Sequence, residues 1–478
     1  MYKTKTIILK EKSPLKQDFD EQAHLAKLFK NSVIFRCRQL MFAQRKNFKD
    51  LTEHEKQVLD EFKKTEPNYR TISNKYYLPS VNHIENMFKV TENSDYYSEL
   101  PRQCTQQIIK EVLSDFKSYF KSCKKYKEDN TNYTGRPQLP KYNKNDAISY
   151  DITNQDAVIY KKKNGSYELK LPKIKKRLDI GNEEITKLKE VTIKPFYNTY
   201  KICLVYEVAD PNPKKLDENR ILSIDLGINN FLTTSNNVGL NPFIINGKVM
   251  KSKNQFFNKK LAYLKSNLPK GQYNSKQLQR LYKKRNNYFE TMIHKISHYI
   301  LEYCVFNNIG TIVIGKNALW KQEINIGDKN NQTFCYIPHS SFTKKLKEKA
   351  INYEVNIIEK EESYTSKASF LDMDEIPIYK ENNNEENNNE EYNFSGKRIH
   401  RGLYKSKKGI IINADVNGAS NILRKEFPNA FKNITDFSYL CKTVEKITIE
   451  KRDKDIKNKK EKETKAKKLN TGNLCKNK

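Results

Sequence analysis

The chain has 478 residues and a formal net charge of +32, since Lys and Arg outnumber Asp and Glu by 89 to 57. Its length allows about three domains, and its charge favours a polyanionic partner bound in a salt-dependent manner. The eight cysteines form no CxxC pair, which argues against a disulfide framework. No apolar run reaches membrane-spanning length and no signal-peptide pattern opens the chain, so we expect a cytoplasmic protein with no membrane partner.

The first 130 residues predict one strand followed by helices. Residues 1–10, MYKTKTIILK, are typical of a strand. The clearest helix runs from about Thr105 to Cys123, with apolar residues in helical spacing at Ile108, Val112, Phe116 and Phe120. Aromatic rings and cations mix at Tyr69, Arg70, Lys75 and Tyr76. This mixture suits base stacking and phosphate contact, but an ordinary helix surface with core tyrosines would look the same.

Strands dominate the next segment, from about Ile148 to Val208. After a turn-rich linker at residues 135–140, runs such as AISYDI, YELKLP and YKICLVYEV are rich in β-branched and aromatic residues. They predict a small antiparallel barrel. Pro211 and Pro213 then mark the passage to another domain.

The stretch from Ile221 to Ser235, ILSIDLGINNFLTTS, predicts a strand, a tight turn at Gly227 and a second strand. It places Asp225 in a buried strand, where an unpaired carboxylate is costly and should have a cation as partner. A metal ion is one such cation. An Asp that only caps the turn is the alternative.

The remaining elements alternate between helices and strands. We expect a basic helical pair from about Lys251 to Phe306, a strand at residues 311–315 parallel to the first, a helix at residues 340–353 and a strand at residues 355–362. The run ENNNEENNNEE indicates a disordered loop. The segment GIIINADVNGASNILRK then repeats the pattern seen at Asp225, since a short apolar strand leads to Asp415.

The motifs around Asp225 and Asp415 resemble the first and third motifs of RuvC-type nuclease domains, which have the RNase H fold. More closely, the segments IDLGINN, EESYTSKASFLD and INADVNGASNILRK resemble the TnpB family of transposon-encoded RNA-guided nucleases. That family is similar to type V CRISPR effectors and to Fanzor proteins. The resemblance covers nearly the whole chain and is weak before residue 130.

The resemblance implies an α/β multidomain fold: an RNase H-like RuvC nuclease domain with a helical recognition lobe and an antiparallel β-barrel wedge domain. The implied segments are a first barrel strand at 1–12, a helical lobe at 13–130, the rest of the barrel at 131–215, a nuclease domain at 216–445 with an insert at about 365–410, and a basic, disordered tail at 446–478.

Two departures from the family pattern affect the expected site. Most members carry a glutamate at the end of the strand equivalent to TIVIG, where this chain has Gly315. Many also carry a CxxC zinc module after YTS, where this chain has SFLD, so zinc is not expected. The segment EESYTSK resembles the DE-x-x-TSK pattern of Fanzor and of TnpB variants with a rearranged glutamate, which implies that Glu362 is the moved ligand. Glu323 and Asp328 are rival ligands, and a solvated acid at a strand end is the plain alternative for Glu362.

By this resemblance, Asp225, Glu362 and Asp415 are the catalytic residues and hold two Mg²⁺ ions, which prefer hard oxygen ligands. The expected activity is RNA-guided DNA cleavage in a prokaryotic, nucleoid-associated protein. The partners are a guide RNA and a double-stranded target DNA with a short flanking motif. Besides the mixed residues near Tyr69, the expected nucleic-acid contacts are Lys253, Lys259, Lys397, Arg398 and Arg401.

Two other functions are compatible with the same sequence. A nuclease-dead, RNA-guided DNA-binding repressor would share every basic feature and differ only at the metal site. A DNA-strand-transferring transposase of the RNase H fold is the third possibility, although nothing in the sequence indicates binding to transposon ends.

Overall fold

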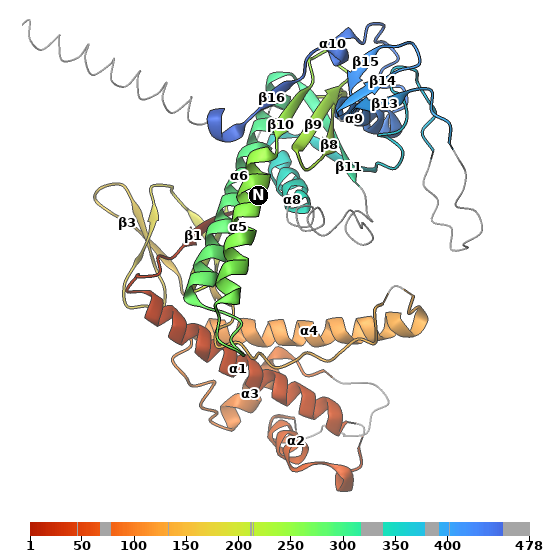
Figure 1. Ribbon diagram of the computed structural model, residues 1–478. Coiled ribbons are helices and arrows are strands. Elements are labelled where there is room, and N and C mark those ends of the chain that lie inside the picture. The colour runs from red at the N-terminus through yellow and green to blue at the C-terminus, as the bar shows by residue number, and fades with distance from the viewer. Residues whose placement is uncertain are drawn as a thin grey trace, which may run out of the picture. The chain divides into compact units, whose positions relative to one another are not determined.

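The computed structural model describes residues 1–44, 46–66, 78–131, 133–210, 213, 215–316, 338–377, 392–400 and 402–452. The chain divides into two compact units, Met1–Asp210 and Pro211–Lys478, and each is described by itself (Figure 1). No helix in the described ranges is long and apolar enough to cross a membrane.

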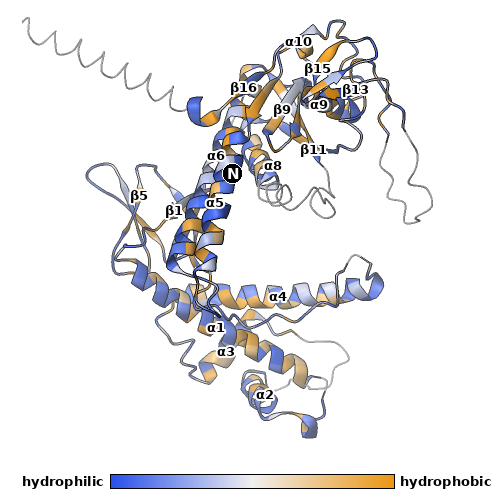
Figure 2. Cartoon of the chain, viewed as in Figure 1, coloured by the Kyte–Doolittle hydropathy of each residue, from blue (hydrophilic) through white to orange (hydrophobic). Residues whose placement is uncertain are grey.

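The helices of the first unit are α1 (Lys16–Ala43), α2 (Glu53–Thr65), α3 (Val81–Val90) and α4 (Arg102–Glu128), with a 3-10 turn η1 (Phe48–Asp50). Hydrophobic and hydrophilic residues alternate along α1 and α4 (Figure 2), as helices that bury one face require. The predicted apolar stripe of α4 is buried at Ile108, Val112 and Phe116. Helix α2 begins where the side chain of Thr52 accepts a hydrogen bond from the backbone of Glu55, in a capping box.

The strands of the first unit form two antiparallel sheets. One has the order β1-β7-β6-β2, and the other has the order β3-β4-β5. Their bounds are β1 (Tyr2–Ile8), β2 (Tyr150–Thr153), β3 (Val158–Lys161), β4 (Tyr167–Lys170), β5 (Leu178–Gly181), β6 (Lys187–Phe196) and β7 (Thr199–Glu207).

These pairings confirm the antiparallel character of the segment and the addition of the N-terminal strand to it, since Tyr2 lies opposite Glu207 and Ile8 opposite Lys201. A closed barrel is not found among the described residues. The chain turns out of the first sheet after β2, where the backbone of Asp156 donates to Thr153, and the next three strands pair with each other instead.

The second unit contains a six-stranded sheet with the order β12-β11-β8-β9-β10-β16. Strands β8, β11 and β12 are parallel neighbours, and the parallel direction was predicted for the strand at residues 311–315. The bounds are β8 (Asp217–Leu226), β9 (Asn230–Asn236), β10 (Phe243–Asn246), β11 (Ile309–Lys316), β12 (Asn356–Glu361) and β16 (Glu445–Ile447).

Strand β16 corrects one expectation, because residues 446–452 were predicted to open a disordered tail. Phe243 of β10 lies opposite Glu445 in parallel register, and Ile449 is buried. The reason is that a short strand at a sheet edge needs only a few backbone hydrogen bonds and one buried side chain, and neither requires an apolar pattern. Residues 453–478 lie outside the described residues.

Helices cover the two faces of this sheet. On β8, Leu222 and Ile224 belong to the core that contains α6 (Lys276–Phe306) and α8 (His339–Ala350), whereas Ile221 belongs to the core that contains α9 (Ala414–Glu426). Side chains alternate along a strand, so Asp225 is on the same side as Ile221, toward α9. The basic helix α5 (Lys248–Ser266) precedes α6, and the pair confirms the helices predicted there.

The insert between β12 and α9 contains a small antiparallel sheet of β13 (Lys397–His400), β14 (Leu403–Lys405) and β15 (Ile411–Asn413). Within the insert, Phe370 is fully buried and packs edge-on against Phe431 and Phe437, with centroid distances of 4.8 and 5.2 Å. Leu371, Ile376 and Phe394 are partly buried. The remaining short elements are η2 (Ile351–Tyr353) and α10 (Ser438–Cys441).

Candidate functional site

Asp225 lies near the end of β8, at the centre of the six-stranded sheet. Ile224 is the last β8 residue that pairs with a residue of β11, and it lies opposite Ile314. The next residues along the two strands are Asp225 and Gly315. By the alternation of side chains along a strand, both face α9.

Glu362 follows directly after β12, on the other side of β11. Lys316 pairs with Glu361, and the backbone N–H of Glu362 donates to the carbonyl of Lys316 at 3.3 Å. A Cβ atom added to Gly315 would collide with the carboxylate of Glu362 and would lie 2.6 Å from Cδ1 of Ile422. The side chain of Glu362 therefore occupies the space in which a side chain at position 315 would begin.

Asp415 lies in the first turn of α9, directly after β15, the short apolar strand that was predicted to lead to it. The side chain of Asn413 caps this helix, because its Oδ1 accepts hydrogen bonds from the backbone N–H groups of Asp415 and Val416 at 3.0 and 3.2 Å. A carboxylate in the first turn is favoured by the helix dipole. Asn230 Nδ2 donates to Asp415 Oδ2 at 2.6 Å, and Arg398 Nη2 lies 3.5 Å from Asp415 Oδ1.

Helix α9 also comes close to Asp225. A Cβ atom added to Gly418 would lie 2.9 Å from Asp225 Oδ2, which is closer than real Cβ contacts allow. The glycine in NADVNGAS is therefore needed for the helix to pack against this carboxylate. Gly418 is three residues after Asp415, so the two lie on the same face of α9. Asp225, which contacts the helix at Gly418, is therefore on the same side of α9 as Asp415.

The negative charges of the other two acids act on Asp225. The pKa of Asp225 is raised well above its ordinary value, first by burial, then by the negative charges of Glu362 and Asp415, and a smaller opposing effect comes from Arg398. Burial also raises the pKa of Glu362, to about 7, with a further contribution from Glu361. Among the described residues, neither the Asp225 nor the Glu362 carboxylate accepts a hydrogen bond. Such a cluster favours a cation.

Glu361 differs from Glu362 although the two are adjacent. Glu361 Oε2 lies 2.7 Å from Lys425 Nζ, and its Oε1 accepts a hydrogen bond from the backbone of Ser363 at 2.5 Å. Burial acts to raise the pKa of Glu361, but the hydrogen bonds from Lys425 and Ser363 outweigh it and lower the pKa. Glu361 therefore already has its cation.

Two asparagines of α9 hold the loop that follows Glu362. Asn417 donates to the carbonyl of Ala368 at 2.8 Å and accepts from the backbone N–H of Phe370 at 2.9 Å. Asn421 donates to the carbonyls of Thr365 and Ala368 at 2.9 and 2.7 Å. These asparagines had no predicted role, although their spacing of four places them on one face of a helix.

His339, at the start of α8, was also missed. Its Nε2 lies 3.0 Å from the carbonyl oxygen of Gly227, in the turn directly after Asp225, and its ring lies 5.4 Å from that of Phe231. No motif surrounds this histidine in the sequence, so its contact with the turn could not have been found before the fold was known.

A cavity of about 540 Å³ opens beside the acids. Asp225 and Asp415 line it with Asn230 and with three cations, Lys248, Arg398 and Lys446. A pocket with carboxylates on one part of its wall and cations on another can hold metal ions together with a phosphate.

The residues expected to contact nucleic acid are only partly brought to this cavity. Arg398 lines it, Lys397 is exposed beside Arg398 on β13, and Lys253 and Lys259 are exposed on α5. Tyr69, Arg70, Lys75, Tyr76 and Arg401 lie outside the described residues, as do the rival ligands Glu323 and Asp328.

The three acids fit magnesium by their chemistry, since all their donors are carboxylate oxygens. Their mutual effect on the pKa of Asp225 is the sign of a site that needs positive charge. In the part of the chain that the structure describes, however, no three His, Cys, Asp or Glu side chains are grouped as closely as a finished metal site requires. The donor set is suitable for magnesium by its chemistry.

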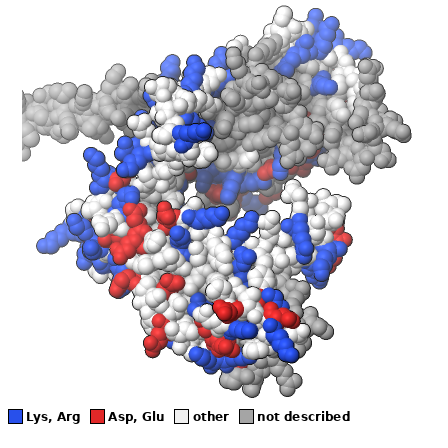
Figure 3. Space-filling view, turned by 60° about the horizontal axis from the view of Figure 1, so that its bottom comes forward, with Lys and Arg blue, Asp and Glu red and all other residues white. Residues whose placement is uncertain are grey.

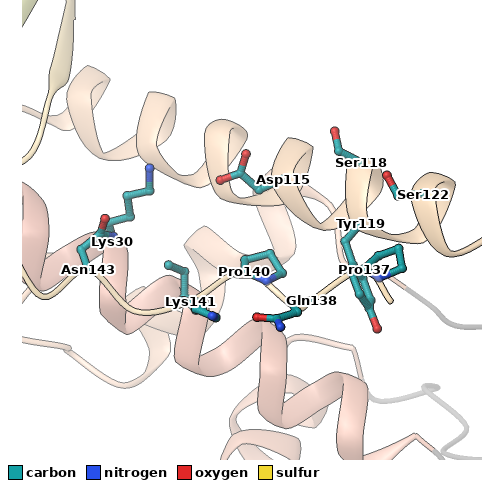
Figure 4. Close-up of a pocket in the computed structure, with 11 residues that line it drawn as sticks. Lys30, Asp115, Ser118, Tyr119, Ser122, Pro137, Gln138, Pro140, Lys141 and Asn143 are labelled. Carbon is teal, nitrogen blue, oxygen red and sulfur yellow. The ribbon is translucent and has the colours of Figure 1, made fainter. Parts of the chain in front are cut away.

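A second hollow, of about 320 Å³, lies in the first unit between α1, α4 and the segment 137–143 (Figure 4). Asp115, Ser118 and Tyr119 of α4 line it, together with Lys30 of α1. Half of its polar side chains are exposed and none is buried. Lys and Arg side chains are mixed with acidic ones on the face drawn in Figure 3, and no single basic patch dominates that view.

Comparisons with known proteins give one family match. Residues 203–321 match the family model OrfB_IS605, described as a probable transposase. This segment includes β8, β9, β10, α5, α6 and β11, and therefore Asp225 and Gly315. No curated protein matches the sequence.

Several solved structures resemble the chain remotely. They include a Cas12f1–sgRNA–target DNA complex (15% identity, 83% of this chain and 82% of that chain, TM-score 0.44). Another is a CRISPR–Cas12f ternary complex (13% identity, 84% of this chain and 81% of that chain, TM-score 0.31). A third is CasPhi-2 (Cas12j) bound to crRNA (10% identity, 94% of this chain and 99% of that chain, TM-score 0.36). With the match to the probable transposases, the predicted resemblance to the TnpB family is confirmed over residues 203–321.

Proposed function

We propose that this protein is an RNA-guided DNA endonuclease that hydrolyses phosphodiester bonds in a RuvC-like site built from Asp225, Glu362 and Asp415. The observation that carries the proposal is the position of Glu362. Its carboxylate fills the space next to Gly315 and raises the pKa of Asp225, as a replacement for an acid on β11 should.

Asp225 would hold both magnesium ions, and Glu362 and Asp415 would each hold one. The ions would supply Lewis acidity for phosphodiester hydrolysis. Asn230 orients Asp415 through its 2.6 Å hydrogen bond. Arg398 lies beside the same carboxylate and lines the cavity, so its guanidinium is available to a phosphate oxygen there.

RNA guidance rests on the charge of +32, on the TnpB resemblance and on the guide-bound complexes among the remote structural relatives. Guide pairing would then supply sequence specificity, and the protein itself would read only a short flanking motif. The domain boundaries expected from the sequence belong to this proposal, with the helical lobe and the sheets of the first unit as the surfaces for guide and target.

The test is purification of the full chain at low salt, sequencing of any bound RNA, and a cleavage assay with a matching duplex. We expect bound RNA, Mg²⁺-dependent cutting of the matched duplex, and binding that weakens steeply with salt. Asp225→Ala and Asp415→Ala should each stop cleavage while guided binding persists, because the phosphate contacts are distributed over the basic surface.

Three results would contradict the proposal. The first is a protein free of RNA that binds duplex DNA equally well without a guide. The second is retained cleavage in either Asp variant. The third is guided binding without any cleavage by the unmodified protein, which would favour the repressor.

A further inference from the structure

The loop after Glu362 is tied to α9 by a continuous series of hydrogen bonds. Asn421 Nδ2 donates to the carbonyl of Thr365. The backbone N–H and the hydroxyl of Thr365 both donate to the carbonyl of Glu362, at 3.2 and 2.8 Å. Two hydrogen-bonded steps therefore connect a side chain of α9 with the backbone of Glu362.

The asparagine side chains are buried, and both donate and accept hydrogen bonds. Asn417 and Asn421 are both 0% exposed, and Thr365 is 3% exposed. Loss of one partner from such a buried pair leaves a polar group unsatisfied, which destabilises the loop. The loop is therefore held firmly, because these buried groups cannot replace their hydrogen bonds by hydrogen bonds to water.

Glu362 needs this support because it lies beyond its strand. β12 ends at Glu361, and the left-handed backbone of Tyr364 (φ 66°) starts a turn directly afterwards. The strand therefore fixes the backbone on one side of Glu362 only. On the other side, the loop bound to Asn417 and Asn421 fixes it.

We propose that Asn417 and Asn421 are positioning residues that set the place of the Glu362 carboxylate relative to Asp415, and that they thereby set the affinity of the site for divalent metal. The inference rests on the proposed function, in which Glu362 and Asp415 bind metal. One helix carries Asp415 and both asparagines, and Gly418 between them admits Asp225. α9 is thus the common support of all three acids.

The experiment is a double-mutant cycle read out by metal binding. Mn²⁺ affinity is measured by electron paramagnetic resonance on the nucleic-acid-free full chain, for the unmodified protein, Asn421→Ala, Glu362→Gln and the double variant. We expect Asn421→Ala to weaken Mn²⁺ binding about 10–100-fold, as the loss of partners behind metal ligands does. In the Glu362→Gln background the same change should have little further effect, since coupled residues are not additive.

Ser420→Ala is the matched control. Ser420 is equally buried on α9, and its hydroxyl lies 2.7 Å from that of Ser235 and does not contact the loop. Its loss should lower the unfolding temperature without changing Mn²⁺ affinity. Asn417→Ala, which removes the contacts with Ala368 and Phe370, is the second variant in case Asn421→Ala does not fold.

Three outcomes can be told apart. Non-additive loss of Mn²⁺ binding in either asparagine variant supports the inference. Unchanged Mn²⁺ affinity in a folded asparagine variant, or an equal loss in the Glu362→Gln background, overturns it and leaves the proposed function standing. Mn²⁺ binding that is insensitive to Asp225→Ala and Glu362→Gln overturns the proposed function, and the inference with it.

Discussion

The ammonium group of Lys425 lies 2.7 Å from the carboxylate of Glu361, whereas the next residue, Glu362, has no such partner among the described residues. Two consecutive glutamates thus have opposite electrostatic surroundings. The ion pair holds the pKa of Glu361 below its ordinary value, and burial raises that of Glu362 to about 7. Only Glu362 has a carboxylate that is left for a further cation.

Glutamine substitutions at the two positions should therefore differ. Glu362→Gln keeps the shape of the side chain and removes its charge, so cleavage should fall below detection while guided binding remains. Glu361→Gln should reduce cleavage by less than about fivefold, because a partly exposed ion pair contributes about 0–1 kcal/mol. Initial cleavage rates at saturating guide and Mg²⁺ measure both. Normal cutting by Glu362→Gln would exclude it as a ligand.

The stability of the metal-free protein should depend on pH through the same acid. The pKa of Glu362 is 4.5 ordinarily and about 7 in the folded chain, so the folded state binds more protons than the unfolded state between these values. The free energy of unfolding contributed by this group therefore falls as pH rises from about 4.5 to about 7. Asp225, whose pKa is also raised, acts in the same direction.

Thermal unfolding at about pH 5 and about pH 7.5, with a chelator, measures this effect. Glu362→Gln should show a smaller decrease in unfolding temperature between the two conditions than the unmodified protein. Added Mg²⁺ should reverse the trend, since metal binding requires deprotonated carboxylates. Equal pH dependence in both proteins would mean that Glu362 does not titrate in this range.

Gly315→Ala tests the contact between β11 and Glu362. The new Cβ would collide with the Glu362 carboxylate and Ile422, so we expect destabilisation by about 1–3 kcal/mol, as for other overpacked interiors. Cleavage should fall as well, because the carboxylate is displaced. Gly135→Ala is the control, since a Cβ there meets nothing within 4 Å. If Gly315→Ala has normal stability and activity, Glu362 does not occupy that space.

Arg398→Gln should change metal affinity and cleavage in opposite directions. The guanidinium lies 3.5 Å from Asp415 and lowers the pKa of Asp225, so it competes with a metal ion for the same negative charge. Its removal should tighten Mn²⁺ binding severalfold and should slow cleavage, because a phosphate contact is lost. Lys432→Gln, which removes an exposed lysine that has no place in the site, should do neither. Weaker Mn²⁺ binding by Arg398→Gln would contradict this role.

Much of the second unit was predictable because its signals are local. Apolar runs and the glycine after Asp225 indicated β8 and β9, and the parallel direction of β11 relative to β8 was expected from the sequence and is confirmed. Apolar residues likewise indicated the short strand that leads to Asp415. The side chain of Asn413 ends that strand and starts a helix, so Asp415 is helical.

Other features depend on contacts that no local pattern contains. The split of the first unit's strands into two sheets is decided by which edges meet, not by the composition of each strand. β16 has only three residues and no apolar period. The asparagines of α9 bind carbonyls of a loop more than forty residues earlier, and an asparagine reveals no such partner in the sequence.

The parallel arrangement of β11 and β12 has a consequence for how relatives of this chain are compared. Their ends lie side by side, so one point in space can be reached by a side chain from either strand. An alignment compares columns and scores Gly315 as a lost acid. A comparison of positions in space counts Glu362 instead. Under the proposed function, active members of such a family should therefore be recognised by a carboxylate in the space beside Asp225, whichever of the two strands supplies it.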